Sequence, residues 1–431
     1  MMPLVRRREE RDSHRLLAGL VLGLLLAASA AGQISTDQVG RQRIVPTKER
    51  TKREAERYHF RLGPLRFSPV LRLYDAGYDS NVFGLPPPLE VARWTASVAA
   101  GFRWLVPAGS KFYVVGEAIP TYVWYQDLAV RSFFGGNYSA YLLGFFNRAS
   151  LEVGGFNSKG LQFIGSEALA PVIQTTLDGS VKMEVDVASN FSLYAKGEVA
   201  RLRFGNSDLA GELLNGLQRT EGAAGAGISY RFSSALAVAL GYEKTITEFV
   251  FDPQLNDNQS DAYLLNIRYD RPRLYVKLAG GYRQGTPYNG SSFASYSEPT
   301  GGYFVSYFLT RTVDLQAYGD RRVTYGVLVP QFLQTRYGGG INFTVYPKVV
   351  LRAFGVWGTN VYGSRTAGGT VTPGHTDNII DYGGGVSATI FRHIVWTTYA
   401  TESKLQSPLP GLDRSALRVL TSLSFDEMFY R

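Results

Sequence analysis

The sequence contains no cysteine, so disulfide bridges, thiolate nucleophiles and cysteine-based metal sites are excluded. Charged residues make up only 19% of the 431 residues, and the mean hydropathy is −0.09. After the first 32 residues the chain has no run of about 18 apolar residues, the length that a membrane-spanning helix needs. Helical 3.6-residue periodicity is also nearly absent. These absences argue against a helical membrane protein and against a soluble α/β enzyme.

Histidine, the usual general base, occurs only four times. His14 lies in the segment that we expect to be removed, His59 lies in a polar tail, and His393 lies in a predicted turn. His375 is two residues from Asp377 in a predicted long loop and is the one candidate for catalysis. A loop histidine is far more often an ordinary polar residue. We therefore predict no catalytic residue, no cofactor and no metal site.

Two further segments resemble binding loops only superficially. The stretch 222–227, GAAGAG, has the wrong glycine spacing for a nucleotide loop and no following helix that would bind phosphate. Small residues in a strand, which allow curvature or close approach of neighbouring groups, are the better interpretation. The acidic stretch Asp252–Asp261 lacks the central glycine and terminal glutamate of a calcium loop, and we interpret it as a solvated loop.

The first 65 residues differ from the rest. A basic start, an apolar run over residues 16–26 and the small-residue site Ala28-Ser29-Ala30 predict a signal peptide over residues 1–32, cleaved near Ala30. An uncleaved anchor is the alternative. Residues 33–65 form a charged tail, expected in the periplasm, with a short helix at Lys48–Tyr58. A flexible tail is the favoured interpretation, and the alternatives are a partner-binding helix or a segment that folds back into a pore. The tail carries much of the net charge of +9, but it lacks the aromatic residues of a nucleic-acid site, so no nucleic-acid partner is predicted.

From residue 66 to the end the pattern is that of strands, and glycine (47), tyrosine (27) and phenylalanine (25) are abundant. The segment 336–362 is the clearest hairpin, because apolar and polar residues alternate on both sides of a break at Pro347. One face carries Ile341, Leu351 and Trp357, and the other carries Arg336, Asn342 and Arg352. Such alternation suits a strand with lipid on one side and water on the other.

Short breaks of this kind recur about every 40 residues. They lie at 107–109, 147–148, 189–190, 233–234, 271–272, 310–311, 347 and 392–393. Longer polar segments separate them, near 79–91, 126–132, 162–173, 205–218, 251–260, 286–295, 326–330, 363–376 and 404–413. Eight short turns and nine long loops predict an all-β transmembrane antiparallel up-and-down barrel over 66–431, with about 18 strands and 16 as the alternative. Short turns are expected in the periplasm and long loops outside the cell. The strand near Arg66–Tyr74 must pair with that near Ser415–Phe429, because an open sheet edge in lipid leaves backbone groups unpaired.

Charged side chains on these strands should face inward, because a charge facing hydrocarbon is costly. The predicted pore-lining residues are Arg103, Glu117, Lys182, Glu184, Lys196, Glu198, Arg268, Lys277, Arg283, Asp314, Asp320, Arg336 and Arg352. Charges of both signs would tune ion preference rather than exclude one sign. The inward tyrosines Tyr113, Tyr194, Tyr275 and Tyr318 would either stack on sugar rings or fill space between neighbours.

The stretch Phe67–Leu73, FSPVLRL, runs into Tyr74–Phe83, YDAGYDSNVF. This first strand and motif resemble the β-barrel porin type 2 group, some of whose members are associated with capsule or exopolysaccharide export. The last strand, ending in Phe429-Tyr430-Arg431, resembles the assembly signal of bacterial outer-membrane barrels, with Arg431 as a departure from it. The resemblance implies a Gram-negative outer-membrane protein whose partners are lipid, lipopolysaccharide and the barrel-assembly machinery.

The sequence therefore predicts a porin-like channel for small hydrophilic solutes, with saccharides among the candidates. A plugged or narrow barrel with a structural or exopolysaccharide-export role is the first alternative, and an outer-membrane enzyme is the weaker one. The position of the tail and long loops decides between an open channel and a plugged or narrow barrel. The oligomeric state does not follow from the sequence.

Overall fold

The computed structural model describes residues 48–58, 60–162, 172–205, 214–326, 331–363, 365–367, 370–372, 374–391 and 394–426. The predicted signal peptide with its cleavage site near Ala30, the tail before Lys48, His59, His393 and the aromatic chain end after Asp426 lie outside these residues. Among the described residues no helix is long and apolar enough to cross a membrane.

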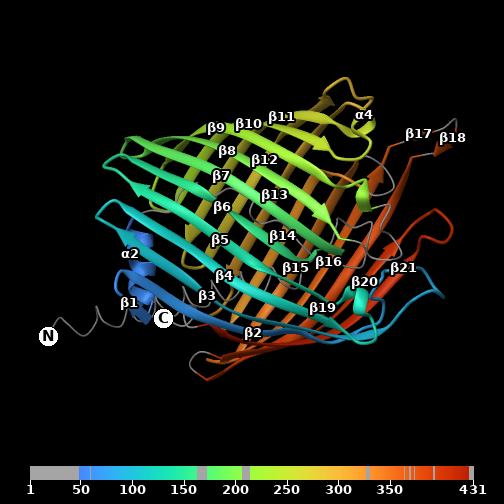
Figure 1. Cartoon of the computed structure of the whole chain (residues 1–431), viewed down its shortest axis with the longest axis horizontal. Helices are drawn as coiled ribbons and strands as arrows, with labels where there is room; N and C mark the ends of the chain where they lie inside the picture. The colour runs from blue at the N-terminus through green and yellow to red at the C-terminus, as the bar shows by residue number, and fades with distance from the viewer. Residues whose placement is uncertain are drawn as a thin grey trace.

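Eighteen antiparallel strands close into one barrel (Figure 1). The strands are β2 (Leu65–Asp79), β3 (Arg93–Ala108), β4 (Phe112–Tyr125), β5 (Phe133–Phe145), β6 (Ala149–Gln162), β7 (Val172–Ala188), β8 (Phe191–Phe204), β9 (Arg219–Arg231), β10 (Leu236–Phe249), β11 (Asn258–Arg271), β12 (Leu274–Pro287), β13 (Tyr296–Phe308), β14 (Val313–Thr324), β15 (Phe332–Tyr346), β16 (Val349–Tyr362), β19 (His375–Phe391), β20 (Ile394–Gln406) and β21 (Arg414–Asp426). The predicted 18-strand up-and-down barrel is confirmed.

Small elements complete the described chain. A three-residue strand, β1 (Phe60–Leu62), pairs with β2. A two-stranded hairpin, β17 (Arg365–Ala367) and β18 (Thr370–Thr372), lies between β16 and β19. Helix α2 (Lys48–Arg57) precedes β1, the 3-10 turn η2 (Ala129–Arg131) follows β4, and α4 (Pro253–Asn256) follows β10.

The strand ends fall where the turn residues predict them. Seven of the predicted short breaks connect successive strands at one end of the barrel, called here the short-turn end. At the eighth, residues 392–393 lie outside the described part, although β19 stops at Phe391 and β20 starts at Ile394. The longer connections lie at the opposite, long-loop end. Loops 163–171, 206–213 and 327–330 fall outside the described residues.

The barrel closes where β2 pairs with β21, as the cost of an open edge requires. Their register runs from Val70 opposite Asp426 to Asp79 opposite Arg418, with a bulge at residues 74–75. In the bulge Asp75 adopts a positive φ of 52°. Nε of Arg418 donates a hydrogen bond of 2.9 Å to Oδ2 of Asp79. An ion pair therefore ties the first strand to the last.

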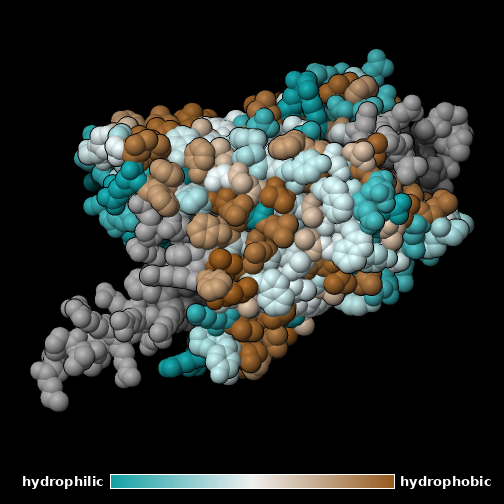
Figure 2. All heavy atoms as spheres, turned by 60° about the horizontal axis from the view of Figure 1, so that its bottom comes forward, coloured by the Kyte–Doolittle hydropathy of each residue, from teal (hydrophilic) through white to brown (hydrophobic). Residues whose placement is uncertain are grey.

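Apolar side chains lie on the outer face of the wall and polar side chains on the inner face, as the period-two pattern predicts. In the hairpin β15–β16 the outward residues Ile341, Leu351 and Trp357 are 42 to 50% exposed, whereas Arg336 and Asn342 on the inward face are 7 and 8% exposed. Figure 2 shows hydrophobic residues spread over the outer face and hydrophilic residues gathered toward the ends. Exposed aromatic side chains pair on this face near both ends, as in Tyr122 and Phe134 at 5.2 Å near the long-loop end and Tyr230 and Phe232 at 4.7 Å near the short-turn end. An apolar wall with aromatic girdles is the surface of a lipid-embedded barrel.

Candidate functional site: the barrel lumen

All thirteen predicted pore-lining residues lie on the inward phase of their strands, and most are grouped by cross-strand contacts. Nε of Arg103 lies 3.4 Å from a carboxylate oxygen of Glu117. Lys182 pairs with Glu152 at 2.8 Å, and Glu184 is buried on the same strand. The register places Arg268 opposite Lys277 and Asp320 opposite Arg336. Glu198 faces inward from β8, next to Ser180 of β7. The remaining members join two larger networks.

The first network centres on Glu243, a residue that the sequence did not single out. Nζ of Lys196 lies 2.5 Å from Oε2 of Glu243, and Nη2 of Arg283 lies 2.9 Å from Oε1. Arg283 also donates from Nη1 to the hydroxyl of Ser260 at 2.9 Å. One carboxylate therefore holds two cations from β8 and β12, strands that are not its neighbours. The alternation of inward residues on β10 was the signal that could have identified Glu243.

Glycines on β9, which have no side chain, make these contacts possible. Gly225 faces inward between β8 and β10, and a Cβ there would lie 3.2 Å from Cε of Lys196. At Gly227 a Cβ would lie 2.4 Å from the hydroxyl of Tyr194, and at Gly241 of β10 only 2.3 Å. Lys196 and Tyr194 therefore lie flat along the wall, over the glycines. This confirms the interpretation of the stretch 222–227 as small residues that allow close approach.

The second network lies on β13–β16. Oδ1 of Asp314 accepts from Ser306 at 2.6 Å, and Oδ2 accepts from Asn342 at 3.0 Å. The amide oxygen of Asn342 then accepts a hydrogen bond of 2.8 Å from Nε of Arg352. Nearer the long-loop end of the same wall, Nε of Arg322 lies 3.4 Å from Oδ2 of Asp320. Several charged residues are thus held by ion pairs or hydrogen bonds along the wall, and both signs occur in each of the two networks.

The inward tyrosines pack sideways rather than presenting free ring faces. Tyr275 and Tyr318 form a buried cluster with Phe304 and Val356, and the ring edge of Tyr318 lies 2.4 Å from an ideal Cβ built on Gly338. Tyr113 and Tyr194 are likewise covered, by Phe145 and by the flat packing on β9. Of the two expectations, filling space between neighbours fits this packing better than stacking on sugars.

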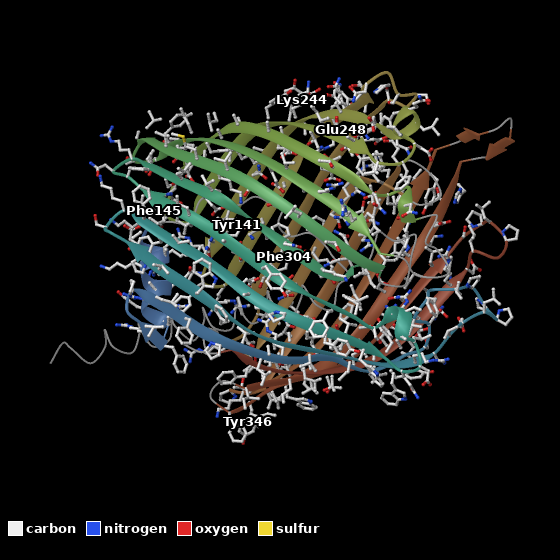
Figure 3. All side chains as sticks on the ribbon, in the orientation of Figure 1. Tyr141, Phe145, Lys244, Glu248, Phe304 and Tyr346 are labelled. Atoms are coloured by element: carbon white, nitrogen blue, oxygen red, sulfur yellow. The ribbon has the colours of Figure 1, made fainter. Side chains whose placement is uncertain are left out.

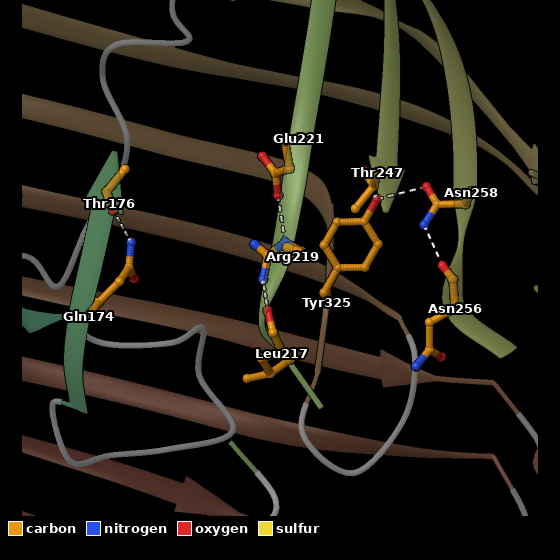
Figure 4. A network of polar contacts seen from close by, with 9 residues as sticks. All are labelled: Gln174, Thr176, Leu217, Arg219, Glu221, Thr247, Asn256, Asn258 and Tyr325. Carbon is orange, nitrogen blue, oxygen red and sulfur yellow. Dashed lines mark hydrogen bonds and ion pairs between the residues drawn. The ribbon is translucent and has the colours of Figure 1, made fainter. Parts of the chain in front are cut away.

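At the long-loop end Tyr325, which follows β14, reaches across the inner side of the wall. Its hydroxyl donates to Oδ1 of Asn258 at 2.8 Å and lies 3.1 Å from the hydroxyl of Thr247. Its ring meets Phe249 edge-on at 5.3 Å, and the guanidinium of Arg219 lies 5.0 Å from the ring centre. We call these contacts the Tyr325 bridge (Figure 4). The bridge reaches inward over β12 and β13 to β9, β10 and β11.

The neighbourhood of the Tyr325 bridge is closely packed. Arg219 donates to Glu221 at 2.6 Å and to the carbonyl of Leu217 at 3.0 Å. Leu217, from the loop between β8 and β9, is only 1% exposed and packs with Leu214 against the inner wall. Burial raises the pKa of Tyr325 to about 12, so the hydroxyl keeps the proton that it donates. Sequence reasoning placed Tyr325 beside a loop and gave no signal for this contact.

Helix α2 lies in the short-turn mouth, against the inner wall (Figure 1). Ala55 and Tyr58 are 3 and 6% exposed and pack on the inward side chains of β3, β4 and β5, including Leu143 and Phe145. Figure 3 shows Tyr141 and Phe145 in this part of the wall. The guanidinium of Arg66 donates to the carbonyl of Ala55 at 2.8 Å. The predicted helix forms, but for residues 48–58 the expectation of a flexible tail is wrong, because the small face of the helix is buried.

His375 lies differently from its prediction as a loop residue. It is the first residue of β19, and its ring stacks on Tyr362 at 4.4 Å. Nε2 of His375 lies 3.7 Å from Oδ1 of Asp377, which is longer than a hydrogen bond. Both side chains are nearly covered. This geometry gives a packing role and supports no catalytic pair.

Comparison with known proteins shows the fold. No family model matches the chain, and no curated protein matches it in sequence. Among solved structures, the outer membrane protein OpdK from Pseudomonas aeruginosa is 12% identical, with 85% of this chain and 100% of that chain covered and a TM-score of 0.52. A BenF-like porin from Pseudomonas fluorescens Pf-5 is 8% identical, with coverages of 85% and 99% and a TM-score of 0.51. The chain therefore has the barrel fold of these outer-membrane proteins.

Proposed function

We propose that this protein is a porin-like outer-membrane channel for small hydrophilic solutes. The observation that carries the proposal is the closed wall of 18 strands with an apolar outer face and a charged, hydrogen-bonded inner face. Barrels of 16 to 18 strands are wide enough for an aqueous channel. The long loops then face the exterior and the short turns, with α2, face the periplasm. Lipid and the barrel-assembly machinery are the partners that such a location implies.

The inner wall supports a channel without strict preference for one charge sign. Cations and carboxylates both line it, and several are held by ion pairs or hydrogen bonds, as in the groups around Glu243 and Asp314. Paired charges leave local fields that orient a polar solute without repelling either sign. One of the similar structures is OpdK with vanillate, so a barrel of this fold can hold a small organic molecule. Saccharides are a finer proposal, supported by the polar wall alone.

Single-channel recording in planar bilayers tests the channel proposal. The purified full chain should give discrete conductance steps, and liposomes that contain it should swell in small sugars faster than in larger ones. Folding is checked separately by the heat-dependent shift of barrel mobility in denaturing gels. A folded protein that gives neither conductance nor swelling contradicts an open channel.

A second candidate is a narrowed barrel with a structural or export role. It is supported by α2 in the short-turn mouth and by the Tyr325 bridge at the long-loop end, because each occupies space inside the wall. The link to exopolysaccharide export has only the residues 67–83 as support. Recording from a variant without residues 48–58 separates the candidates: a large gain in conductance supports a plugged barrel, and no change supports a channel that is already open.

A further inference from the structure

The outer wall of β6–β10 carries a cluster of cations toward the long-loop end. The cluster consists of Lys159 on β6, Arg201 and Arg203 on β8, and Lys244 on β10. All four are exposed and lie on the outward phase of their strands. Figure 3 shows Lys244 and Glu248 along the outer edge of β10, away from the lumen. Outward cations on lipid-facing strands contrast with the apolar residues that cover most of this face.

The strand register brings three of the cations close together. Lys159 and Arg203 lie opposite the same residue of β7, Thr175, so two strand spacings, about 10 Å, separate their backbones. Arg201 lies on the same face as Arg203, about 7 Å along the strand. Lys244 is two strands from β8, at the level of Gly197 in the register, which is four residues and about 13 Å along the strand from Arg201. The long, flexible side chains of Lys159, Arg201 and Arg203 can therefore converge on one phosphate, whereas Lys244 stands apart, nearer the middle of the wall.

The cluster has few anionic partners within the described part of the chain. None of the four cations forms an ion pair there, and the described contact of Lys159 is with the ring of Phe133 at 5.4 Å. Two carboxylates lie on the same face. The register places Glu248 two strands from Arg201 and Asp261 of β11 directly opposite Lys244, so Lys159, Arg201 and Arg203 are the cations without a carboxylate on an adjacent strand position. Cations beside hydrocarbon are costly when unpaired. An external anion would remove that cost.

An apolar groove of about 570 Å³ lies directly beside the cations, nearer the middle of the wall. Gly179 and Gly222 form its floor, and a Cβ at either position would meet nothing within 4 Å. Val181 and Val199 line it, and Lys244 stands at its edge. Val199 is 57% exposed, so the groove opens toward lipid. A depression of this chemistry suits an acyl chain.

We propose that the cations and the groove together bind a phosphorylated, acylated glycolipid of the lipopolysaccharide class. The inference rests on the proposed outer-membrane location, in which the long-loop end faces the leaflet that contains such lipids. Arginine forks bind phosphate through two parallel hydrogen bonds, and the groove takes an acyl chain below the headgroup. Cations at two places on the wall, Lys159 with Arg201 and Arg203, and Lys244 beside the groove, match a headgroup with more than one phosphate better than a phospholipid with one.

Native mass spectrometry of the full chain in detergent, titrated with bis-phosphorylated lipid A, tests the proposal. The variant Arg201→Gln/Arg203→Gln should raise the Kd by about tenfold or more, because two charge-assisted contacts are lost. The variant Arg271→Gln/Arg273→Gln removes the same charge from exposed residues beside the turn between β11 and β12 and should leave the Kd unchanged. Equal loss in both variants overturns the proposal.

Gly222→Leu tests the groove, since its side chain would occupy open space on the outer face. It should weaken lipid A binding and leave the barrel folded, and if it does not fold, the arginine variants still decide. Equally tight binding of a dephosphorylated glycolipid or of phosphatidylglycerol overturns the proposal. The proposal is also overturned if the protein binds no glycolipid and is instead a dimer that these substitutions dissociate. Because binding is measured in detergent, failure of the channel proposal would appear separately, as absent conductance with lipid A binding intact.

Discussion

The hydroxyl of Tyr325 donates a hydrogen bond of 2.8 Å to Oδ1 of Asn258, although the two residues lie 67 positions apart. Tyr325 follows β14 and Asn258 begins β11, so the contact passes over two intervening strands. A tyrosine with a buried ring and a satisfied hydroxyl can hold a loop in one place. The Tyr325 bridge therefore holds the start of the loop after β14 against the inner side of β9, β10 and β11 at the long-loop end.

Replacing Tyr325 by alanine should free space inside the wall at the long-loop end. The variant loses the ring contacts with Phe249 and Arg219 and both hydroxyl contacts, and each hydrogen bond contributes about 1 kcal/mol. We expect higher single-channel conductance with more frequent fluctuations. The milder change Tyr325→Phe keeps the ring, so it should raise the fluctuations more than the mean conductance.

Phe251→Ala is the matched control for Tyr325→Ala, because it removes an exposed aromatic ring from the neighbouring loop. Its conductance should equal that of the unchanged protein. The pKa of about 12 for Tyr325 also predicts that the hydroxyl stays protonated from about pH 5 to about pH 9. Conductance of the unchanged protein should show no step from this group in that range. Equal conductance in Tyr325→Ala and Phe251→Ala would show that the bridge does not limit the pore.

Glu243→Gln should shift ion preference toward anions. The substitution removes the carboxylate that Lys196 and Arg283 share, so two inward cations lose their charge partner while the volume of the wall hardly changes. The reversal potential in a potassium chloride gradient measures the shift. Asp127→Asn removes one negative charge from an exposed loop residue and should move the potential much less. A shift toward cations in Glu243→Gln would contradict the assigned network.

The sequence predicted the barrel well because its signals are local. Short polar breaks determine where strands end, and period-two alternation determines which face holds Arg352 and which holds Trp357. A shift of one residue would exchange the two faces and place the charge of Arg352 in lipid. The contact of Lys196 with Glu243 spans 47 positions. It depends on the absence of a side chain at Gly225, on the strand between them. No pairwise pattern in the sequence encodes that register. Likewise, the charged sequence of α2 gives no sign that the side of the helix with Ala55 packs on the inner side of β3, β4 and β5.

The glycines of β9 can be tested by filling one of them. In Gly227→Val the new side chain would meet the hydroxyl of Tyr194 and the carbonyl oxygen of Leu240, both within 2.4 Å of the ideal Cβ. Overpacking of this kind costs about 1–3 kcal/mol, so the temperature at which the folded band disappears in gels should fall. Gly280→Val makes the same change on β12, where a Cβ meets nothing within 4 Å, and should leave that temperature nearly unchanged. A larger fall in Gly280→Val would contradict the flat packing of Tyr194.

The docking of α2 can be measured directly because the chain has no cysteine, so a single introduced thiol is the sole site for a maleimide. Ala55→Cys places the thiol on the buried face of the helix, which is 3% exposed, and Glu56→Cys places it on the neighbouring exposed position. Reaction at residue 55 requires α2 to leave the wall, so it should be about tenfold slower or more than at residue 56. Both thiols should react equally fast after denaturation, which controls for intrinsic reactivity. Equal rates in the folded barrel would mean that α2 is detached, and the short-turn mouth would then be open. If the rates differ as expected and conductance still occurs, solutes pass beside the docked helix, because α2 packs on β3, β4 and β5 and these form only part of the mouth.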